Sequence, residues 1–438
     1  MNLFKISWKY LTFRPLSTGL NIFLLALGLA IITVLLLIQD QFEKKMNQDA
    51  AGIDLVVGAK GSPLQLILSS VYHIDFPTGN IKIEEAKKLS RNRLVKNIIP
   101  LALGDNLEGF RIVGTNQDYL KLYGVEFSQG KTWELPFEVV LGSEAAAKTG
   151  LTVGSEFASS HGISVGSHAH DQHNFVVSGI LAPRGNVVDR LIMTSIESVW
   201  YTHDEEPQSE PSAAPEDPVS TGEDPGVPEE DHEVHVTDHD EKLHQPVAKT
   251  GFPLSEGDRE VTTLLLQYRN PMAAIQLPRM INSGTSMQAA SPSFEMSRLF
   301  ELLGVGISLL QGLAVVLVLV AGLGIFIALY NSLKERKYDL AILRALGASR
   351  VQLLVLIFLE GLMLTFLGAV LGIALGHTFL WLLVTQSEQS VVTAIQPWIF
   401  LEQELWILVY ALCVGVVASL IPAWSAYQTS IAKQLTKA

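Results

Sequence analysis

Four long runs of apolar residues divide this chain, and polar sequence separates them. The runs lie at residues 17–38, 299–333, 351–384 and 405–427. A helix needs roughly 20 consecutive apolar residues to cross a bilayer, and all four runs reach that length. The second and third runs exceed it, so we expect them to tilt or, for 299–333, to continue beyond the bilayer as a stalk. The pattern predicts four transmembrane helices.

The polar sequence between the first and second runs, residues 39–298, reads as mixed α and β. Strands are expected where short apolar, β-branched segments occur, and helices where apolar residues recur every three or four positions. The expected strands are 53–59, 109–115, 137–142, 174–181, 190–196 and 260–269, and the expected helices are 82–92, 143–150 and 270–282. We therefore predict an α-helical membrane protein with four transmembrane helices and a large α+β extracytoplasmic domain between helices 1 and 2.

The distribution of Lys and Arg predicts the orientation. These residues occur near both ends of the chain and between the second and third runs, whereas residues 385–404 contain none. By the positive-inside rule, 334–350 and the tail at 428–438 are cytoplasmic, and 385–404 is an external loop. Residues 1–16 combine an apolar side with basic residues and predict a cytoplasmic interfacial amphipathic helix. No small-residue cleavage site follows 17–38, so we expect an uncleaved signal anchor.

Composition supports a membrane protein and localises the charge. The chain is 48% hydrophobic and 17% charged, which is too apolar for a soluble protein of this length. The net charge of −13 arises in one segment, because residues 201–245 hold fifteen Asp and Glu against one Lys. The remainder is near neutral and predicts no nucleic-acid partner. The insert at 202–251 is rich in Pro, Glu, Asp and Ser, so we expect it to be disordered. The single cysteine, Cys413, excludes an intrachain disulfide.

Histidines are enriched in two polar stretches of the expected external domain. Imidazoles near carboxylates suit labile Zn²⁺, although a solvated linker would have the same composition. The spacing predicts no fixed tetrahedral site, so metal binding and the linker interpretation both stay open. No HExxH-type pairing occurs, and we assign no catalytic residue. The candidate metal ligands are His161, His168, His170, His173, His232, His235, His239 and His244.

The segment from Gly124 to Thr132 imitates a phosphate-binding loop. The P-loop needs four residues between its glycines, and this segment has five. It also lies on the expected external side, and Trp133 follows it where a helix should begin. We expect a turn here, and no nucleotide bound by this chain.

The third apolar run carries two ionisable residues and a row of glycines. An ionisable group inside a membrane is a functional candidate. A single carboxylate makes a poor proton relay, so we interpret Glu360 as a structural group that pairs with a neighbouring helix or with 334–350. His377 lies near the outer end, and we expect it at the membrane interface. Small residues let helix backbones approach closely, which predicts packing against another span or a second permease copy. The glycines are Gly361, Gly368, Gly372 and Gly376.

Between the second and third runs stands a charged segment, KERKYDLAILRALGASR, at 334–350. Its residues favour a helix, Gly347 is suited to end that helix, and Ser349 is suited to cap the next. A short cytoplasmic helix joined firmly to two spans is suited to dock into a groove of a partner protein.

This segment closely resembles the signature of the FtsX-like permeases of ABC transporters, which include MacB-type and lipoprotein-releasing permeases. The family pattern is a Glu-Arg pair followed, after a few residues, by an apolar residue and then Arg, Ala, Leu, Gly, Ala and Ser. Glu360 with its spaced glycines, and Pro422 with Ala423 near the end of the fourth span, match the family as well. The residues of segment 334–350 that match the family pattern are Glu335, Arg336, Leu343, Arg344, Ala345, Leu346, Gly347, Ala348 and Ser349.

The resemblance implies a FtsX-like permease domain at about 299–432 and a MacB-like periplasmic core domain, in a bacterial cytoplasmic (inner) membrane. It implies a homodimer whose ATP is hydrolysed by a separate cytoplasmic ATPase, so that this chain is not an enzyme. The helix with Asp339 would then be the coupling helix that contacts the ATPase. Mechanotransmission to the periplasmic domain would serve export, lipoprotein extraction or periplasmic substrate handling, with a periplasmic lipoprotein or binding protein as a further partner. Alternatives are a regulatory scaffold that activates a periplasmic enzyme and a zinc-handling module.

Overall fold

The computed structural model describes residues 3–13, 15–158, 160–161, 174–204, 245–253, 258–386 and 395–428. The chain forms two compact units. We call Met1–Lys45 with Leu299–Ala438 the helical unit, and Met46–Arg298 the α+β unit. Two helices, α2 (Pro15–Asp49) and α10 (Pro292–Glu335), contain the boundaries between the units.

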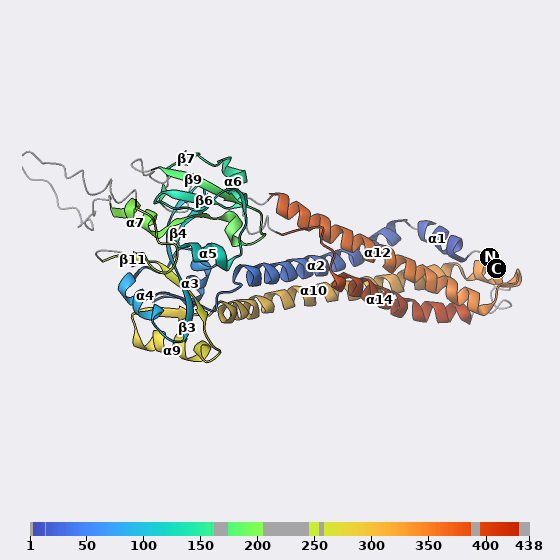
Figure 1. Cartoon of the computed structure of the whole chain (residues 1–438). Helices are drawn as coiled ribbons and strands as arrows, with labels where there is room; N and C mark the ends of the chain where they lie inside the picture. The colour runs from blue at the N-terminus through green and yellow to red at the C-terminus, as the bar shows by residue number, and fades with distance from the viewer. Residues whose placement is uncertain are drawn as a thin grey trace, which may run out of the picture. The chain divides into compact units, whose positions relative to one another are not determined.

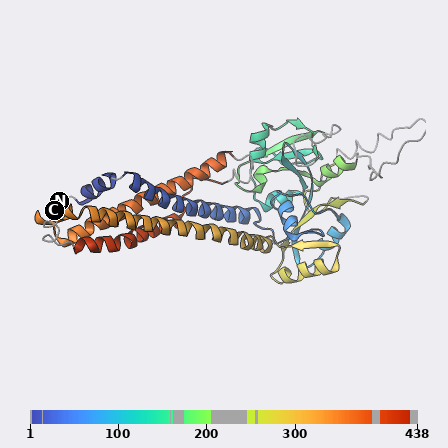
Figure 2. The same ribbon diagram turned by 180° about the vertical axis from the view of Figure 1, so that it is seen from behind.

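The helical unit is built from long apolar helices (Figure 1). Its elements are α1 (Leu3–Phe13), α2, α10, α11 (Lys337–Ala345), α12 (Arg350–Gln386) and α14 (Glu402–Tyr427). Four of them, α2, α10, α12 and α14, are long and apolar enough to cross a membrane. The views from both sides show α2 in blue beside α10 in gold (Figure 2). Leu25 of α2, Val318 of α10, Leu364 of α12 and Ala411 of α14 share one buried cluster.

The α+β unit contains a large mixed sheet with short helices. The strands are β1 (Leu55–Ala59), β2 (Ile81–Lys82), β3 (Val95–Leu107), β4 (Phe110–Thr115), β5 (Phe127–Gly130), β6 (Glu138–Leu141), β7 (Glu156–Phe157), β8 (Ser160–His161), β9 (Phe175–Leu181), β10 (Ile192–Ser195), β11 (Glu260–Val261), β12 (Thr263–Tyr268) and β13 (Met287–Ala290). The helices are α3 (Pro63–Ser70), α4 (Ile83–Ser90), α5 (Gln117–Leu122), α6 (Ser143–Thr149), α7 (Ile196–Asp204) and α9 (Ala273–Gly284), with a 3₁₀ turn at Val187–Arg190.

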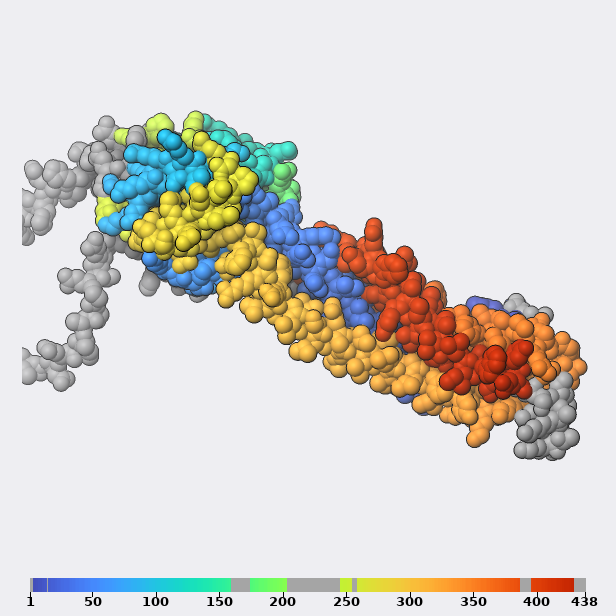
Figure 3. Space-filling view, turned by 90° about the horizontal axis from the view of Figure 1, so that it is seen from below, coloured from blue at the N-terminus to red at the C-terminus, as the bar shows by residue number. Residues whose placement is uncertain are grey.

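The strand order is β13-β1-β12-β3-β4-β10-β6-β9-β5, with β7 beside β9, β8 beside β3, and β11 paired with β2. The long strand β3 joins two halves of the sheet, because its first part pairs with β12 and its second part with β4. Each half has its own core. One core lies around Leu55, Ile83 and Leu277, and the other around Val139 and Phe175. In the space-filling view α4, in cyan, and α9, in yellow, lie side by side on the surface of the first half (Figure 3).

The structure forms a strand or helix in each of the nine segments of the α+β unit where the sequence predicts one. Gly150 ends α6 in the left-handed conformation, with φ of 70°, as a glycine after a helix favours. The predicted strand 260–269 is split at Thr262, whose hydroxyl accepts a hydrogen bond from the backbone N–H of Leu103 at 2.9 Å. The sequence did not predict β3, which contains Pro100, a residue that normally argues against a central strand.

The acidic insert is only partly described. Thr202 belongs to the last turn of α7, and residues 245–251 lie in irregular structure. The predicted disorder of the insert falls on residues 205–244, which lie outside the described part of the chain.

Candidate functional site

The segment at 334–350 forms a short helix between two breaks. Helix α10 ends at Glu335, Arg336 leaves helical geometry with ψ of 12°, and α11 follows. Gly347 has φ of 104°, a value that favours glycine. The hydroxyl of Ser349 accepts the N–H of Gln352 at 3.2 Å, and the Gln352 side chain accepts the N–H of Ser349 at 2.8 Å. The stop at Gly347 and the cap at Ser349 are both confirmed.

One face of α11 is fixed to the helical unit. Leu340 and Ala341 are fully buried. Leu340 belongs to a cluster that includes Leu333 of α10, Leu353 of α12 and Ala423 of α14. Helix α11 therefore packs against the ends of three apolar helices and is held as a rigid extension of them.

The other face carries large exposed apolar side chains. Leu346 is 80% exposed and Tyr338 is 48% exposed. Tyr338 was absent from the residues that the sequence predicted at this site, although an aromatic ring within a charged run is a signal for a contact surface. Of the predicted contacts, those exposed are Glu335, Asp339, Ala345, Leu346, Gly347 and Ser349, and those partly buried are Leu343, Arg344 and Ala348.

Arg336 is the predicted contact residue that points inward. Its guanidinium lies 4.0 Å from the centre of the Tyr10 ring of α1. Its Nη1 is 3.4 Å from Oε1 of Glu360, and its Nη2 is 3.4 Å from the carbonyl oxygen of Tyr10. Glu360 is only 3% exposed. Its pairing with Arg336 agrees with the prediction that Glu360 pairs with the 334–350 segment. Arg336 thus links α1, α11 and α12 and does not belong to the exposed face of α11.

His377, which the sequence predicts at the membrane interface, is buried among protein side chains. It is 1% exposed, with Nδ1 2.6 Å from the carbonyl oxygen of Pro397 and Nε2 3.0 Å from Oε2 of Glu404. The rings of Trp398 and Phe400 lie against it. A carbonyl only accepts, so Nδ1 carries a hydrogen and Glu404 meets the other ring nitrogen. The partners follow His377 by 20 and 27 residues, and no local signal in the sequence links them.

The glycines of α12 lie where neighbouring helices approach most closely. A β-carbon on Gly372 would lie 2.8 Å from the carbonyl oxygen of Ala26 and 2.9 Å from Cβ of Leu29, both on α2. One on Gly361 would lie 2.8 Å from Cβ of Ser419 on α14. Such distances exclude any side chain without a shift of the backbone, so these glycines set the spacing of α12 against α2 and α14. Gly368 and Gly376 also face α2, and Pro422 is buried within α14.

Two further predictions from the sequence concern the P-loop-like segment and the histidines proposed as metal ligands. Gly124 ends a turn after α5, and residues 127–130 form β5, so the imitation P-loop is a turn and a strand with no helix behind it. The eight histidines proposed as metal ligands lie outside the described part of the chain, apart from the backbone of His161 in β8. Within the described residues, no group of three or more His, Cys, Asp or Glu gathers to hold a metal.

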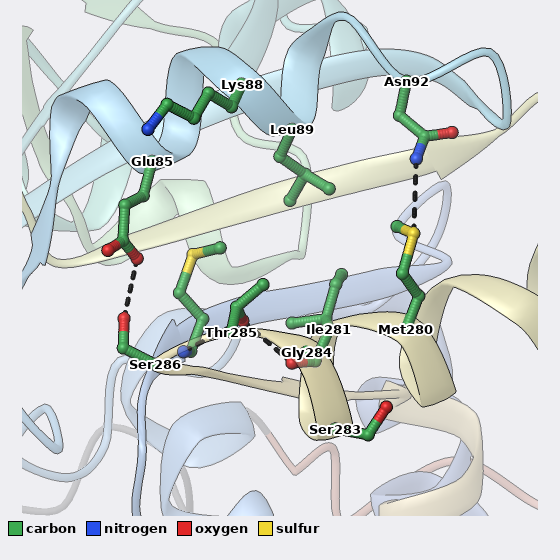
Figure 4. Close-up of a pocket in the computed structure, with 11 residues that line it drawn as sticks. Glu85, Lys88, Leu89, Asn92, Met280, Ile281, Ser283, Gly284, Thr285 and Ser286 are labelled. Carbon is green, nitrogen blue, oxygen red and sulfur yellow. Dashed lines mark hydrogen bonds between the residues drawn. The ribbon is translucent and has the colours of Figure 1, made fainter.

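A surface groove of about 710 Å³ lies between α4 and α9 (Figure 4). Leu89 and Met280 contribute apolar surface. Two of its polar side chains already have partners within the groove, since Ser286 Oγ donates to Glu85 Oε2 at 2.7 Å and Asn92 Nδ2 lies 3.7 Å from Sδ of Met280. With these side chains already paired, we assign no site to the groove.

The fold defines a membrane protein whose helical unit has four long apolar helices, with a large α+β unit inserted in the chain between the first and second of them. The family model for the FtsX-like permease C-terminal domain matches residues 312–431, and that for the MacB-like periplasmic core domain matches residues 18–221. Together the two matches cover most of the chain. It belongs to the FtsX-like, MacB-type family of ABC transporter permeases.

A sequence relative agrees with this assignment. An uncharacterized ABC transporter permease of Methanocaldococcus jannaschii is 29% identical over 125 residues, which are 28% of this chain and 31% of the relative. This chain thus matches about a third of that relative's length.

Among solved structures, the periplasmic region of MacB from Actinobacillus actinomycetemcomitans aligns over 58% of this chain and 97% of its own, at 12% identity and a TM-score of 0.33. The extracellular domain of the noncanonic ABC-type transporter YknZ from Gram-positive bacteria aligns over 55% and 99%, at 11% identity and a TM-score of 0.29.

Proposed function

We propose that this chain is the permease subunit of an ABC transporter complex and transmits ATP hydrolysis by a separate cytoplasmic ATPase to its own α+β unit. It would act with a second permease copy in a bacterial inner membrane, with both termini in the cytoplasm. The work done outside would be export, lipoprotein extraction or the handling of a periplasmic substrate. Membership of the permease family supports the class, and the geometry of α11 supports the mechanism.

The observation that best supports this proposal is that α11 has one buried face and one exposed face. Its buried face, with Leu340 and Ala341, belongs to the core of the helical unit, while Tyr338 and Leu346 are exposed. Fully burying a leucine side chain is worth about 1.5–3 kcal/mol, so a partner that covers Leu346 gains binding energy. Because α11 is packed against three apolar helices, a push on it moves those helices as well. A docking helix that transmits force needs both properties.

A route to the α+β unit runs along α2 and α10, which are continuous helices that extend into it. Two buried tyrosines hold the C-terminal end of α2. The hydroxyl of Tyr72 donates to the carbonyl oxygen of Met46 at 3.2 Å, and the hydroxyl of Tyr123 donates to the backbone carbonyl oxygen of Asp49 at 2.9 Å. Burial raises the pKa of Tyr123 well above its ordinary value, so the hydroxyl stays a donor. Displacement of α2 would therefore pull on the segments after α3 and α5.

The test is to purify the full-length protein with its ATPase and to measure binding and stimulated ATP hydrolysis. The double variant Tyr338→Ala/Leu346→Ala removes both exposed apolar side chains and leaves the buried face intact. We expect the affinity for the ATPase to fall at least about tenfold, which corresponds to about 1.4 kcal/mol, with a matching loss of stimulated hydrolysis.

The matched control is Leu405→Ala/Trp406→Ala, which also removes one exposed leucine and one exposed aromatic ring, from the opposite end of the helical unit. It should bind the ATPase as the wild type does. Unchanged ATPase binding and stimulation in the Tyr338/Leu346 variant would show that α11 is not the docking helix.

A further inference from the structure

A half-open cavity with both polar and apolar lining lies in the helical unit beside the Arg336–Glu360 pair. Its volume is about 280 Å³. Side chains from α1, α2, α10 and α12 line it, so four elements meet where α10 gives way to α11. Polar space among apolar helices is costly unless its groups are satisfied. The polar lining includes Tyr10, Thr18, Asn21, Ser332, Arg336 and Glu360.

Two buried acceptors in this lining lack a partner among the described residues. They are Oε2 of Glu360 and Oγ of Ser332. Glu360 is 3% exposed and Ser332 is 6% exposed. An ionised carboxylate oxygen that is buried without a hydrogen bond is strongly unfavourable. A ligand that donates hydrogen bonds would satisfy both atoms.

The charge of the lining restricts the ligand further. Arg336 and Glu360 form a salt bridge of 3.4 Å and neutralise each other. A ligand with a net charge would leave that charge uncompensated in a medium of low dielectric constant. A zwitterion would not, since its cation can face Glu360 and its anion can face Arg336. The contacts of Arg336 with Glu360 and Tyr10 are both long, which leaves donor capacity for an acid oxygen.

We propose that the cavity binds the headgroup of phosphatidylethanolamine. The primary ammonium would donate to Glu360 Oε2 and Ser332 Oγ, and the phosphate would accept from Arg336. A lipid is favoured over a soluble zwitterion because exposed apolar side chains adjoin the cavity. Leu20 of α2 and Ile327 of α10 line it and are themselves more than half exposed, which gives acyl chains a surface to follow.

The position of α1 agrees with this assignment. Its exposed Phe4, Trp8 and Phe13 are typical of a helix that lies at the boundary between headgroups and acyl chains. Tyr10 on the same helix lines the cavity, so the cavity lies at headgroup depth. A bound lipid would join α1 to the junction of α10 and α11. This proposal stands independently of the ATPase.

The experiment uses the full-length protein in nanodiscs that contain equal amounts of phosphatidylethanolamine and phosphatidylcholine with identical acyl chains. The protein is extracted gently, and the retained lipids are quantified by native mass spectrometry. A quaternary ammonium has no N–H to donate, so we expect phosphatidylethanolamine to be retained at least fivefold over phosphatidylcholine. Equal retention of the two lipids would overturn the proposal.

Two variants localise the binding. Glu360→Gln removes the negative charge and Ser332→Ala removes the hydroxyl, and each should reduce the enrichment severalfold. The matched controls are Glu404→Gln and Ser419→Ala, which alter a buried carboxylate and a buried hydroxyl of the same unit outside the cavity lining. They should keep the enrichment. If Glu360→Gln does not fold, Ser332→Ala decides, and unchanged enrichment in it would overturn the site.

A further arm distinguishes the source of the headgroup. Delipidated protein is titrated with soluble phosphoethanolamine. Weak or undetectable binding, together with lipid enrichment, supports a lipid site. Tight binding of phosphoethanolamine without preference for phosphatidylethanolamine would assign the cavity to a soluble zwitterion and overturn the lipid assignment.

Discussion

The helical unit and the α+β unit place their side chains in opposite ways. In the α+β unit many of the large side chains are inside, with Trp133, Tyr119 and Phe175 fully buried. In the helical unit large apolar side chains such as Leu309 and Trp406 are more than 70% exposed, while Gly372 lies against α2 inside. Water drives apolar surface inward, whereas lipid tails are as apolar as leucine, so helix contact in a membrane depends on close fit.

Two buried carboxylates, Asp189 of the α+β unit and Glu360 of the helical unit, find different partners. Asp189 of the α+β unit accepts the backbone N–H of Arg184 at 3.0 Å and of Gly185 at 2.6 Å. Among the described residues, Glu360 of the helical unit has only the Arg336 side chain as a partner. Loops leave backbone N–H groups available, but long helices use theirs internally. A buried carboxylate in the interior of a long helix, as Glu360 is in α12, must therefore find side chains or a ligand.

The strongest test of this comparison removes bulk from the α+β unit. Trp133→Ala would leave a large cavity around a fully buried side chain. We expect the free energy of unfolding of this unit to fall by about 3–5 kcal/mol. Hydrogen exchange of the full-length protein measures the loss unit by unit. Phe76→Ala, which removes an aromatic ring that is more than half exposed, should change it little. Equal effects of the two substitutions would contradict the assignment of Trp133 to a packed core.

The complementary test adds bulk to the helical unit. In Gly372→Leu the new side chain would meet Ala26 and Leu29 of α2. We expect a destabilisation of about 1–3 kcal/mol by overpacking, seen as a lower midpoint of thermal unfolding in detergent. Gly19→Leu is the control, because nothing lies within 4 Å of a β-carbon there. A tolerated leucine at 372 would show that α12 and α2 do not approach as closely as described.

A smaller effect concerns pH and His73 of the α+β unit. Burial, with positively charged Arg111 and Arg190 nearby, holds the pKa of His73 well below its ordinary value of 6.5. The unfolded chain takes up a proton near pH 6.5 and the folded chain does not. Stability should therefore fall as the pH drops below 6.5, by at most about 1.4 kcal/mol per pH unit from this residue.

His73→Asn removes this titration and suits the backbone, because His73 has φ of 54° and asparagine tolerates that conformation. It also loses the contact of Nε2 with the Tyr119 hydroxyl at 3.2 Å, which lowers stability at every pH. The slope of the unfolding free energy against pH between 6.5 and 5 is the measured quantity. A slope equal to that of the wild type would rule out His73 as its source.

Much of the chain follows from local sequence. The four long helices follow from run length, and the limits of α11 follow from Gly347 and Ser349, because backbone conformation and capping act over a few residues. The strand β3 was missed for the converse reason. Pro100 opposes a strand locally, but in the sheet it lies opposite Leu264, and its carbonyl oxygen accepts the hydroxyl of Thr115 at 3.0 Å. Packing on both sides overrides the local preference.

The sequence by itself determined the class of the protein, its apolar helices and the presence of a charged helix between two of them. Only the tertiary structure decided that Arg336 turns inward to Glu360, 24 residues away, and to Tyr10, 326 residues away. It likewise placed His377 against Glu404. The length of a hydrophobic run depends only on residues that are neighbours in the sequence. The partner of a buried charge depends on which helices pack together, because low-dielectric surroundings force each charge to find its counterpart wherever the fold brings one close.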